Sequence, residues 1–185
     1  MIRHIHILNA SRLDDRDLLL AAEAAGREYG APAGVERISL GFDRAFDPSR
    51  GQYRSGILLA EVLSGSSSPD EKRIAVVDVD LFVPVLTFVF GEAQLEGLAA
   101  IVSTHRLSDE FYGLKGDRRR LLERLEKEVV HELGHTAGLA HCRQFECVMR
   151  SSTYVEEIDL KKGSLCSECR ARVVNATSIR TGELL

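Results

Sequence analysis

The sequence predicts an α/β protein built on a mostly parallel β-sheet. Short segments rich in β-branched residues alternate along the chain with longer segments whose apolar residues recur at helical spacing. Hydrophobic residues make up 44% of the 185 residues and charged residues 28%, values typical of a soluble globular protein. This length fits one domain, or one domain with a small appendage.

Four of the expected elements lie in the first 65 residues. Composition and turn residues predict a strand over 3–8, a helix over 12–29, a strand over 35–40 and a second helix. Ser11 is expected to cap the first helix and Gly30 to end it. The second helix is expected to open at Pro48 and to present Tyr53, Ile57, Ala60 and Leu63 on one face. The segment 65–69, Gly-Ser-Ser-Ser-Pro, is a loop.

Three more strand candidates precede a long helix. They cover 74–81, which should be buried, 85–90 and 99–103. Asp117 can cap the long helix, and Gly138 can close it in the left-handed conformation. Its core stripe repeats every four residues and consists of Leu121, Leu125, Val129 and Leu133. The chain then becomes irregular, and the pattern of 170–185 leaves open whether this tail is disordered or packs on the sheet.

Charge and hydropathy exclude several classes of protein. The net charge of −4 argues against a nucleic-acid-binding protein, although basic residues lie near the cysteines: Arg143, Arg150, Lys161, Lys162, Arg170 and Arg172. The first residues lack the continuous apolar stretch of about 7–15 residues of a secretory signal. The longest apolar stretch, 81–90, is shorter than the roughly 18 residues that span a bilayer. We therefore expect a cytoplasmic protein without a membrane segment; its oligomeric state stays open.

Three histidines at the end of the long helix suggest a metal site. Residues 131–141 read His-Glu-Leu-Gly-His-Thr-Ala-Gly-Leu-Ala-His. His131 and His135 lie four residues apart on one helical face and can bind the same ion. Gly138 allows the chain to turn back, so that His141 can supply a third ligand. Three protein ligands leave one tetrahedral position for water, which is the pattern of a catalytic zinc.

Glu132 is placed to act as a base and not as a ligand. It lies about 100° around the helix from His131. Zinc lowers the pKa of bound water to about 7 and polarises a carbonyl, so Glu132 would take the water proton and pass it to the leaving amine. A bare H-E-x-x-H also arises by chance, but Gly138 and His141 argue against coincidence. Asp78 and Asp80 could orient a ligand histidine, or simply form hydrogen bonds at a strand end.

All four cysteines lie within 142–169 and predict a second metal site. Cys166 and Cys169 form a C-x-x-C pair, and Cys142 and Cys147 form a second pair. A closed, structural zinc on four thiolates is favoured over two disulfides or free thiols, because we expect a cytosolic chain. Because Cys142 directly follows His141, we also expect loss of this zinc to weaken the histidine site.

The spacing H-E-x-x-H-x-x-G-x3-C-x4-C-x-M, from His131 to Met149, followed by C-x-x-C, resembles the archaemetzincins. These are metzincin-type zinc peptidases with an additional cysteine-bound zinc. Sixteen residues separate Met149 from Cys166, one fewer than in the family pattern. The segments 78–84 and 88–93 are also similar to the family.

The resemblance implies a metzincin-like fold. It consists of a twisted, mostly parallel sheet with an antiparallel edge strand, a backing helix, an active-site helix and a small irregular C-terminal subdomain. We expect the edge strand within 85–90, with an extended substrate paired to it. The single domain 1–185 would divide into an α/β subdomain, 1–138, and a subdomain with the Met-turn and the cysteine-bound zinc, 139–185.

The resemblance also implies the function and the roles of the site residues. His131, His135 and His141 would hold a catalytic zinc, Glu132 would be the general base, and Met149 would be the Met-turn residue beneath the zinc. With the structural zinc on Cys142, Cys147, Cys166 and Cys169, the chain would bind two Zn²⁺ ions. We expect a zinc metallopeptidase that hydrolyses peptides or unfolded polypeptides. The alternative is a zinc-stabilised peptide-binding module with little or no turnover.

Overall fold

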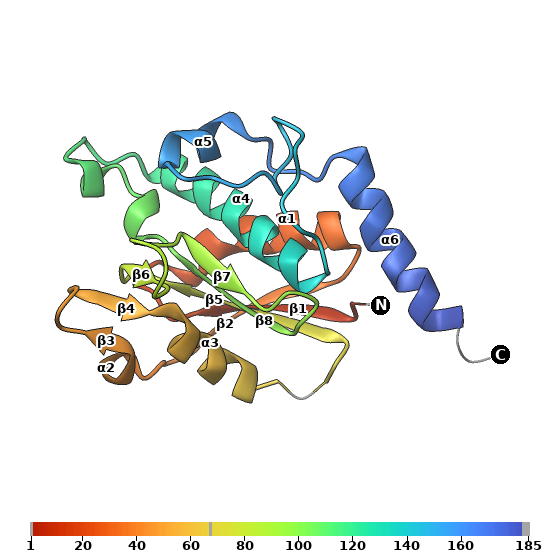
Figure 1. The fold of residues 1–185 in the computed structure, drawn as a ribbon, viewed down its shortest axis with the longest axis horizontal. Coiled ribbons are helices and arrows are strands. Elements are labelled where there is room, and N and C mark those ends of the chain that lie inside the picture. The colour runs from red at the N-terminus through yellow and green to blue at the C-terminus, as the bar shows by residue number, and fades with distance from the viewer. Residues whose placement is uncertain (1, 67, 183–185) are drawn as a thin grey trace.

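The computed structural model describes residues 2–66 and 68–182, with side chains up to Val174. A five-stranded sheet in the order β2-β1-β5-β8-β7 forms its centre (Figure 1). The strands are β1 (His4–Asn9), β2 (Ala33–Arg37), β5 (Glu71–Val77), β7 (Gly91–Ala93) and β8 (Ala99–Ser103). The first four neighbours in this order pair in parallel, and β7 runs antiparallel to β8 at one edge. The expected mostly parallel sheet with an antiparallel edge strand is confirmed.

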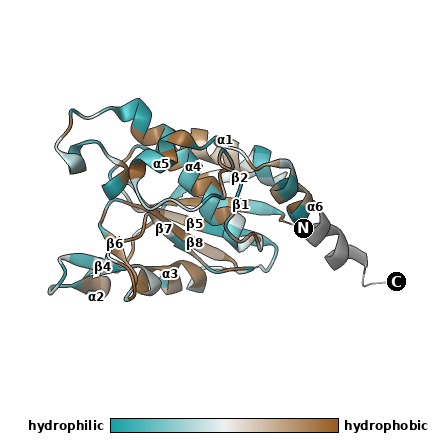
Figure 2. Ribbon diagram, turned by 45° about the horizontal axis from the view of Figure 1, so that its top comes forward, coloured by the Kyte–Doolittle hydropathy of each residue, from teal (hydrophilic) through white to brown (hydrophobic). Residues whose placement is uncertain are grey.

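Helices cover both faces of this sheet. Helices α1 (Leu19–Tyr29) and α4 (Arg118–Thr136) pack on one face, and α3 (Ser55–Ser64) packs on the other (Figure 1). Neighbouring residues of β5 serve the two faces alternately, so that Val76 joins the core under α1 and α4 while Ala75 joins the core under α3. A parallel sheet covered on both faces needs such continuous apolar strands, and Figure 2 shows β5 and β8 as hydrophobic.

Smaller elements surround this layer structure. A second sheet, in the order β3-β4-β6, consists of Phe46–Asp47, Gln52–Arg54 and Leu81–Phe82. The remaining helices are η1 (Asp15–Leu18), α2 (Phe42–Ala45), η2 (His105–Leu107), η3 (Glu110–Tyr112), α5 (Val155–Leu160) and α6 (Ser167–Gly182). The undecided tail is therefore helical as far as Gly182, and 183–185 lie outside the described residues. Within the described ranges, no helix is long and apolar enough to cross a membrane.

The first helix begins later than predicted. Residues 15–18 form the 3-10 helix η1, which Asp14 caps, and α1 starts only at Leu19. The expected cap, Ser11, instead donates its hydroxyl hydrogen bond to the side chain of Asn9. Gly30 ends α1 as predicted, in the left-handed conformation with φ 64°.

The prediction of a helix that begins at Pro48 is wrong. Pro48 lies in a turn between β3 and β4, Tyr53 belongs to β4, and α3 starts at Ser55. The side chain of Asp47 accepts hydrogen bonds from the backbone N–H and the hydroxyl of Ser49, which stabilises a turn at the expense of a helix. Two strands are also displaced: 35–40 to 33–37, and 74–81 to 71–77.

The edge strand is likewise not where it was expected. Segment 85–90 forms no strand, and Val89 makes only an isolated antiparallel bridge to Leu81. Carbonyl groups of Leu86 and Thr87 accept hydrogen bonds from the guanidinium group of Arg50 instead of from a neighbouring strand. The edge strand is β7, which follows directly.

The long helix agrees closely with its prediction. The side chain of Asp117 accepts a hydrogen bond from the backbone N–H of Arg120, which makes Asp117 the N-cap of α4. The last helical residue is Thr136, and Gly138 turns the chain away with φ 91°.

Candidate metal centres and active-site cleft

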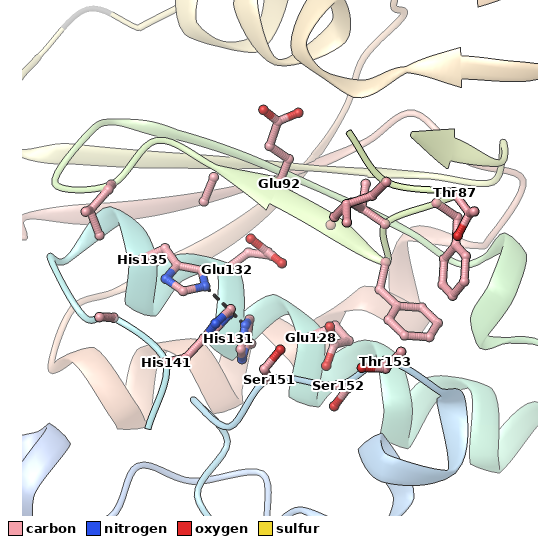
Figure 3. Close-up of a pocket in the computed structure, with 18 residues that line it drawn as sticks. Thr87, Glu92, Glu128, His131, Glu132, His135, His141, Ser151, Ser152 and Thr153 are labelled. Carbon is pink, nitrogen blue, oxygen red and sulfur yellow. Dashed lines mark hydrogen bonds between the residues drawn. The ribbon is translucent and has the colours of Figure 1, made fainter. Parts of the chain in front are cut away.

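The three histidines of the motif converge at the C-terminal end of α4. His131 and His135 project from one face of the helix, and His141 approaches from the segment that returns after Gly138 (Figure 3). One ring nitrogen from each histidine lies within 4.8 Å of the others. The Nε2 atoms of His131 and His135 are 3.1 Å apart, close to the roughly 3.3 Å between two nitrogen ligands of a tetrahedral zinc.

Backbone carbonyls fix the orientation of two of these rings. Nδ1 of His131 lies 2.8 Å from the carbonyl oxygen of Val148, and Nδ1 of His135 lies 2.7 Å from that of Leu139. A carbonyl oxygen only accepts, so both Nδ1 atoms carry the proton and both Nε2 atoms keep a free lone pair. Burial lowers the pKa of both imidazoles, which favours the neutral form that binds a metal.

Glu132 is buried between α4 and the edge strand. A Cβ atom at Gly91 of β7 would lie 2.6 Å from Oε1 of Glu132, so the carboxylate packs directly against the backbone of this strand. Burial raises the pKa of Glu132 well above its ordinary value, and the nearby charge of Glu128 raises it further. The side chain therefore follows His131 on α4 and is shielded from bulk solvent.

Met149 packs against α4, in a space that Gly134 leaves open. A Cβ atom at Gly134 would lie 2.3 Å from Sδ of Met149 and 3.0 Å from the hydroxyl oxygen of Tyr29. Tyr29, at the end of α1, donates a hydrogen bond to the carbonyl of Val130. The backing helix, the active-site helix and the Met149 turn thus meet at one glycine.

The four cysteines form a second cluster with the geometry of a closed metal site. All four Sγ atoms lie within 4.8 Å of one another. Sγ of Cys142 is 3.8 Å from that of Cys166, and Sγ of Cys147 is 3.9 Å from that of Cys169. These distances exceed a disulfide bond of about 2.05 Å but match the roughly 3.8 Å between two thiolates of a tetrahedral zinc.

The two clusters share their backbone. Cys142 follows His141, and its N–H donates a hydrogen bond to the carbonyl of Met149. Cys147 precedes Val148, whose carbonyl holds the ring of His131. The segment that carries the cysteines therefore positions two of the three histidines.

A cleft of about 640 Å³ runs past the histidines, between the edge strand and the turn that follows Met149 (Figure 3). Segment 86–93 forms one wall and Ser151, Ser152 and Thr153 form the other. Residues 86–90 line this cleft, so their apolar side chains, which suggested a strand in the sequence, form part of its wall.

A buried ion pair lies beside the histidines. Glu128, one turn before His131 on α4, lines the cleft. Nζ of Lys161 donates hydrogen bonds to Oε1 of Glu128 over 3.1 Å and to the carbonyl of Arg150 over 3.0 Å. The side chain of Lys161 is 1% exposed. This pair ties the active-site helix to the chain just after Met149.

Asp78 and Asp80 do not orient the histidines. Asp78 accepts a hydrogen bond from Arg12, and Asp80 accepts two from Arg106. These carboxylates serve ordinary ion pairs at the end of the sheet. Backbone carbonyls take the orienting role instead.

No pattern in the sequence predicted a site role for Gly91, Gly134, Glu128 or Lys161. Glu128 could have been found, because it lies three residues before His131 and so shares its helical face. The residues around Lys161 give no indication of its role, because its ion-pair partner, Glu128, lies 33 residues away in the sequence.

One family model matches the chain. It describes peptidase family M54 and covers residues 67–175. The archaemetzincin of Methanocaldococcus jannaschii is 34% identical over 169 residues, which span 91% of this chain and 92% of that relative. The archaemetzincin of Natronomonas pharaonis is 40% identical over 135 residues, 71% of this chain and 77% of that relative.

Solved structures agree with the sequence comparisons. The crystal structure of archaemetzincin from Methanopyrus kandleri superposes with a TM-score of 0.83 at 30% identity, covering 95% of this chain and 96% of that chain. A zinc-dependent peptidase from Methanocorpusculum labreanum superposes with a TM-score of 0.82 at 30% identity, covering 91% and 99%. Because the family model spans more than half of the chain and the similarity extends over nearly all of the fold, the chain belongs to peptidase family M54, the archaemetzincins, and is a zinc metallopeptidase.

Proposed function

We propose that the chain hydrolyses peptide bonds in this cleft with a catalytic zinc on His131, His135 and His141 and with Glu132 as general base and acid. The observation that carries the proposal is the convergence of three imidazoles, two of them with Nε2 free and Nδ1 bound to a carbonyl. When bound, zinc would polarise the peptide carbonyl and acidify a water molecule.

Glu132 would carry the proton. It lies beside the imidazoles without being one of the three ligands, and its burial raises its pKa toward the range in which a carboxylate exchanges protons near neutral pH. In this proposal the carboxylate accepts a proton from the attacking water and returns it to the leaving amine.

The edge strand would bind the substrate. β7 pairs with β8 on one side only, and the cleft lies along its residues. An extended peptide can add to this edge by backbone hydrogen bonds. Antiparallel addition is the slightly more stable pairing, and it would place the residue that follows the scissile bond toward Glu128.

The cysteine cluster would hold a second, structural zinc. Four thiolates complete a tetrahedron and leave no position for water or substrate. Its proposed role is to hold the chain on either side of Met149, and with it His141, in position.

Cleavage of a diverse peptide mixture, read by mass spectrometry, tests the proposal. The zinc-loaded native protein should cut peptides, and Glu132→Gln should lose roughly 10²–10⁴-fold in rate while keeping its zinc. Glu123→Gln, on the exposed face of the same helix, is the matched control and should cut like the native protein. If the native protein were silent at full zinc occupancy, a peptide-binding module without turnover would replace the peptidase.

A further inference from the structure

The cleft contains a charged group that the proposed hydrolysis does not use. Figure 3 shows Glu128 on α4 beside His131, near Ser152 and Thr153 of the opposite wall. Phe88 and Phe90 also line the cleft. An acidic group near an aromatic wall, one helical turn from the histidines, is positioned to contact a substrate side chain.

The ion pair with Lys161 holds the carboxylate of Glu128 in place through Oε1 and leaves Oε2 able to accept hydrogen bonds. Lys161 does not line the cleft and binds Oε1 of Glu128. Among the residues that the structure describes, no other group donates a hydrogen bond to the carboxylate. A carboxylate offers about four acceptor positions, so Glu128 can still accept hydrogen bonds from a bound molecule.

A second possible acceptor faces Glu128 from the opposite wall. The hydroxyl oxygen of Ser152 is buried and has no hydrogen-bond partner within the described ranges. Together with Glu128 it makes this end of the cleft rich in acceptors, so that a ligand group carrying several N–H donors would satisfy it best.

We propose that this end of the cleft selects substrates with a lysine or arginine side chain, which Glu128 recognises, at the residue that follows the scissile bond. The apolar stem of such a side chain packs against Phe88 and Phe90 while its cationic head reaches the carboxylate. An apolar side chain adds no donor for Oε2 of the buried carboxylate, and an acidic one is repelled by it. This inference rests on the proposed function for the position of the scissile bond.

The native zinc-loaded protein provides the first test. In the cleaved peptide mixture, lysine and arginine should be enriched at the position after the cut. Cuts that favour apolar or acidic residues there would overturn the specificity and leave the peptidase intact. An absence of all cuts would count against the peptidase alone, because the next measurement does not need turnover.

Binding to zinc-loaded Glu132→Gln supplies that measurement. Two labelled peptides that differ only in one lysine or norleucine are compared by fluorescence anisotropy. The lysine peptide should bind roughly tenfold to a hundredfold more tightly. Equal affinities, or no binding of either peptide, would overturn the inference.

A reversed ion pair separates recognition from a merely structural role. The double variant Glu128→Lys with Lys161→Glu keeps a buried pair but turns the opposite charge toward the cleft, so the preference should change from lysine to glutamate. Equal losses for both peptides would show a structural role only. If this variant fails to fold, Glu128→Gln with Lys161→Gln should bring the lysine-to-norleucine ratio of kcat/KM close to one.

Discussion

At two glycines of the structure, an added side chain would collide with neighbouring atoms. Gly91 lets β7 pass directly over the carboxylate of Glu132, and Gly134 lets Met149 approach α4. Both contacts join segments that are distant in sequence. At the residue scale, the geometry of the metal centre therefore depends on the absence of two methyl groups.

Gly91→Ala should impair hydrolysis without removing zinc. The new Cβ atom would lie 2.6 Å from Oε1 of Glu132, and displacing a catalytic group by about 1 Å can cost roughly 10²-fold in rate. Peptide cleavage and zinc content measure the two effects. Gly56→Ala is the matched control, because its nearest contact would be an ordinary 3.9 Å; equal activities of the two variants would contradict the assigned contact.

Gly134→Ala should destabilise the fold by about 1–3 kcal/mol through overpacking. Its Cβ atom would overlap Sδ of Met149. Urea denaturation measures the change in the free energy of unfolding. Met149→Ala removes the overlapping sulfur, so the two substitutions together should cost less than the sum of the single changes. Strict additivity would argue against direct contact.

At the scale of elements, α4 is held at both ends by different means. Asp117 caps its N-terminus. At its C-terminus, the carbonyl of His135 accepts a hydrogen bond from the N–H of Glu96, and Nζ of Lys72 binds the carbonyl of Thr136. These partners come from the loop between β7 and β8 and from β5. The helix that carries two histidines is thus tied directly to the sheet edge that would receive the substrate.

The N-cap should make stability depend on pH. Hydrogen bonding to the backbone N–H of Arg120 lowers the pKa of Asp117 in the folded state. A lowered folded-state pKa stabilises the fold above the unfolded value of about 3.9, and this stabilisation is lost as the pH falls through the folded value. Denaturation midpoints of the native protein and Asp117→Asn, which caps without titrating, should therefore differ in slope below about pH 4. Identical slopes would contradict the cap's contribution.

The cysteine segment should control zinc binding at the histidines. Cys166→Ser removes one candidate ligand of the cysteine cluster and should loosen the chain through Cys142 and Val148, which position His141 and His131. Zinc affinity at the histidine centre, measured by competition with a chelator, should fall. Ser167→Ala, a neighbouring substitution outside the cluster, should leave it unchanged. Unaltered affinity in Cys166→Ser would show that the two centres are independent.

For the whole molecule, we expect the two parts on either side of Gly138 to differ in what stabilises them. Residues before Gly138 form the sheet and the helices packed on it, whereas the segment from 139 onward consists of loops, the short α5 and α6. This segment contributes Leu139, Val148 and Met149, among others, to the core under α1 and α4. Loops with few regular hydrogen bonds depend on metal ligation for order.

Removing zinc should therefore unfold the second part first. Native mass spectrometry is expected to find two zinc ions per chain before chelation. Afterwards, hydrogen exchange should increase across 139–174 while β1, β5 and β8 keep their protection. Simultaneous loss of protection throughout the chain would show that the proposed subdomains are one cooperative unit.

Features that depend on local patterns could be predicted from the amino-acid sequence. A stripe at steps of four, with Asp117 before it and Gly138 after it, defines α4, and the same periodicity brings His131 and His135 together. The β-branched residues Ile101 and Val102 likewise favour the strand found in β8.

Features that depend on contacts between distant segments could not be predicted from local patterns. Apolar composition could not distinguish a strand from a cleft wall, so the edge strand was expected in 85–90 and lies in β7. Nor could it reveal that Gly91 covers Glu132 or that Lys161 binds Glu128. Helical periodicity is set by bonds within one segment, whereas these contacts arise when the sheet, α4 and the turn after Met149 pack together.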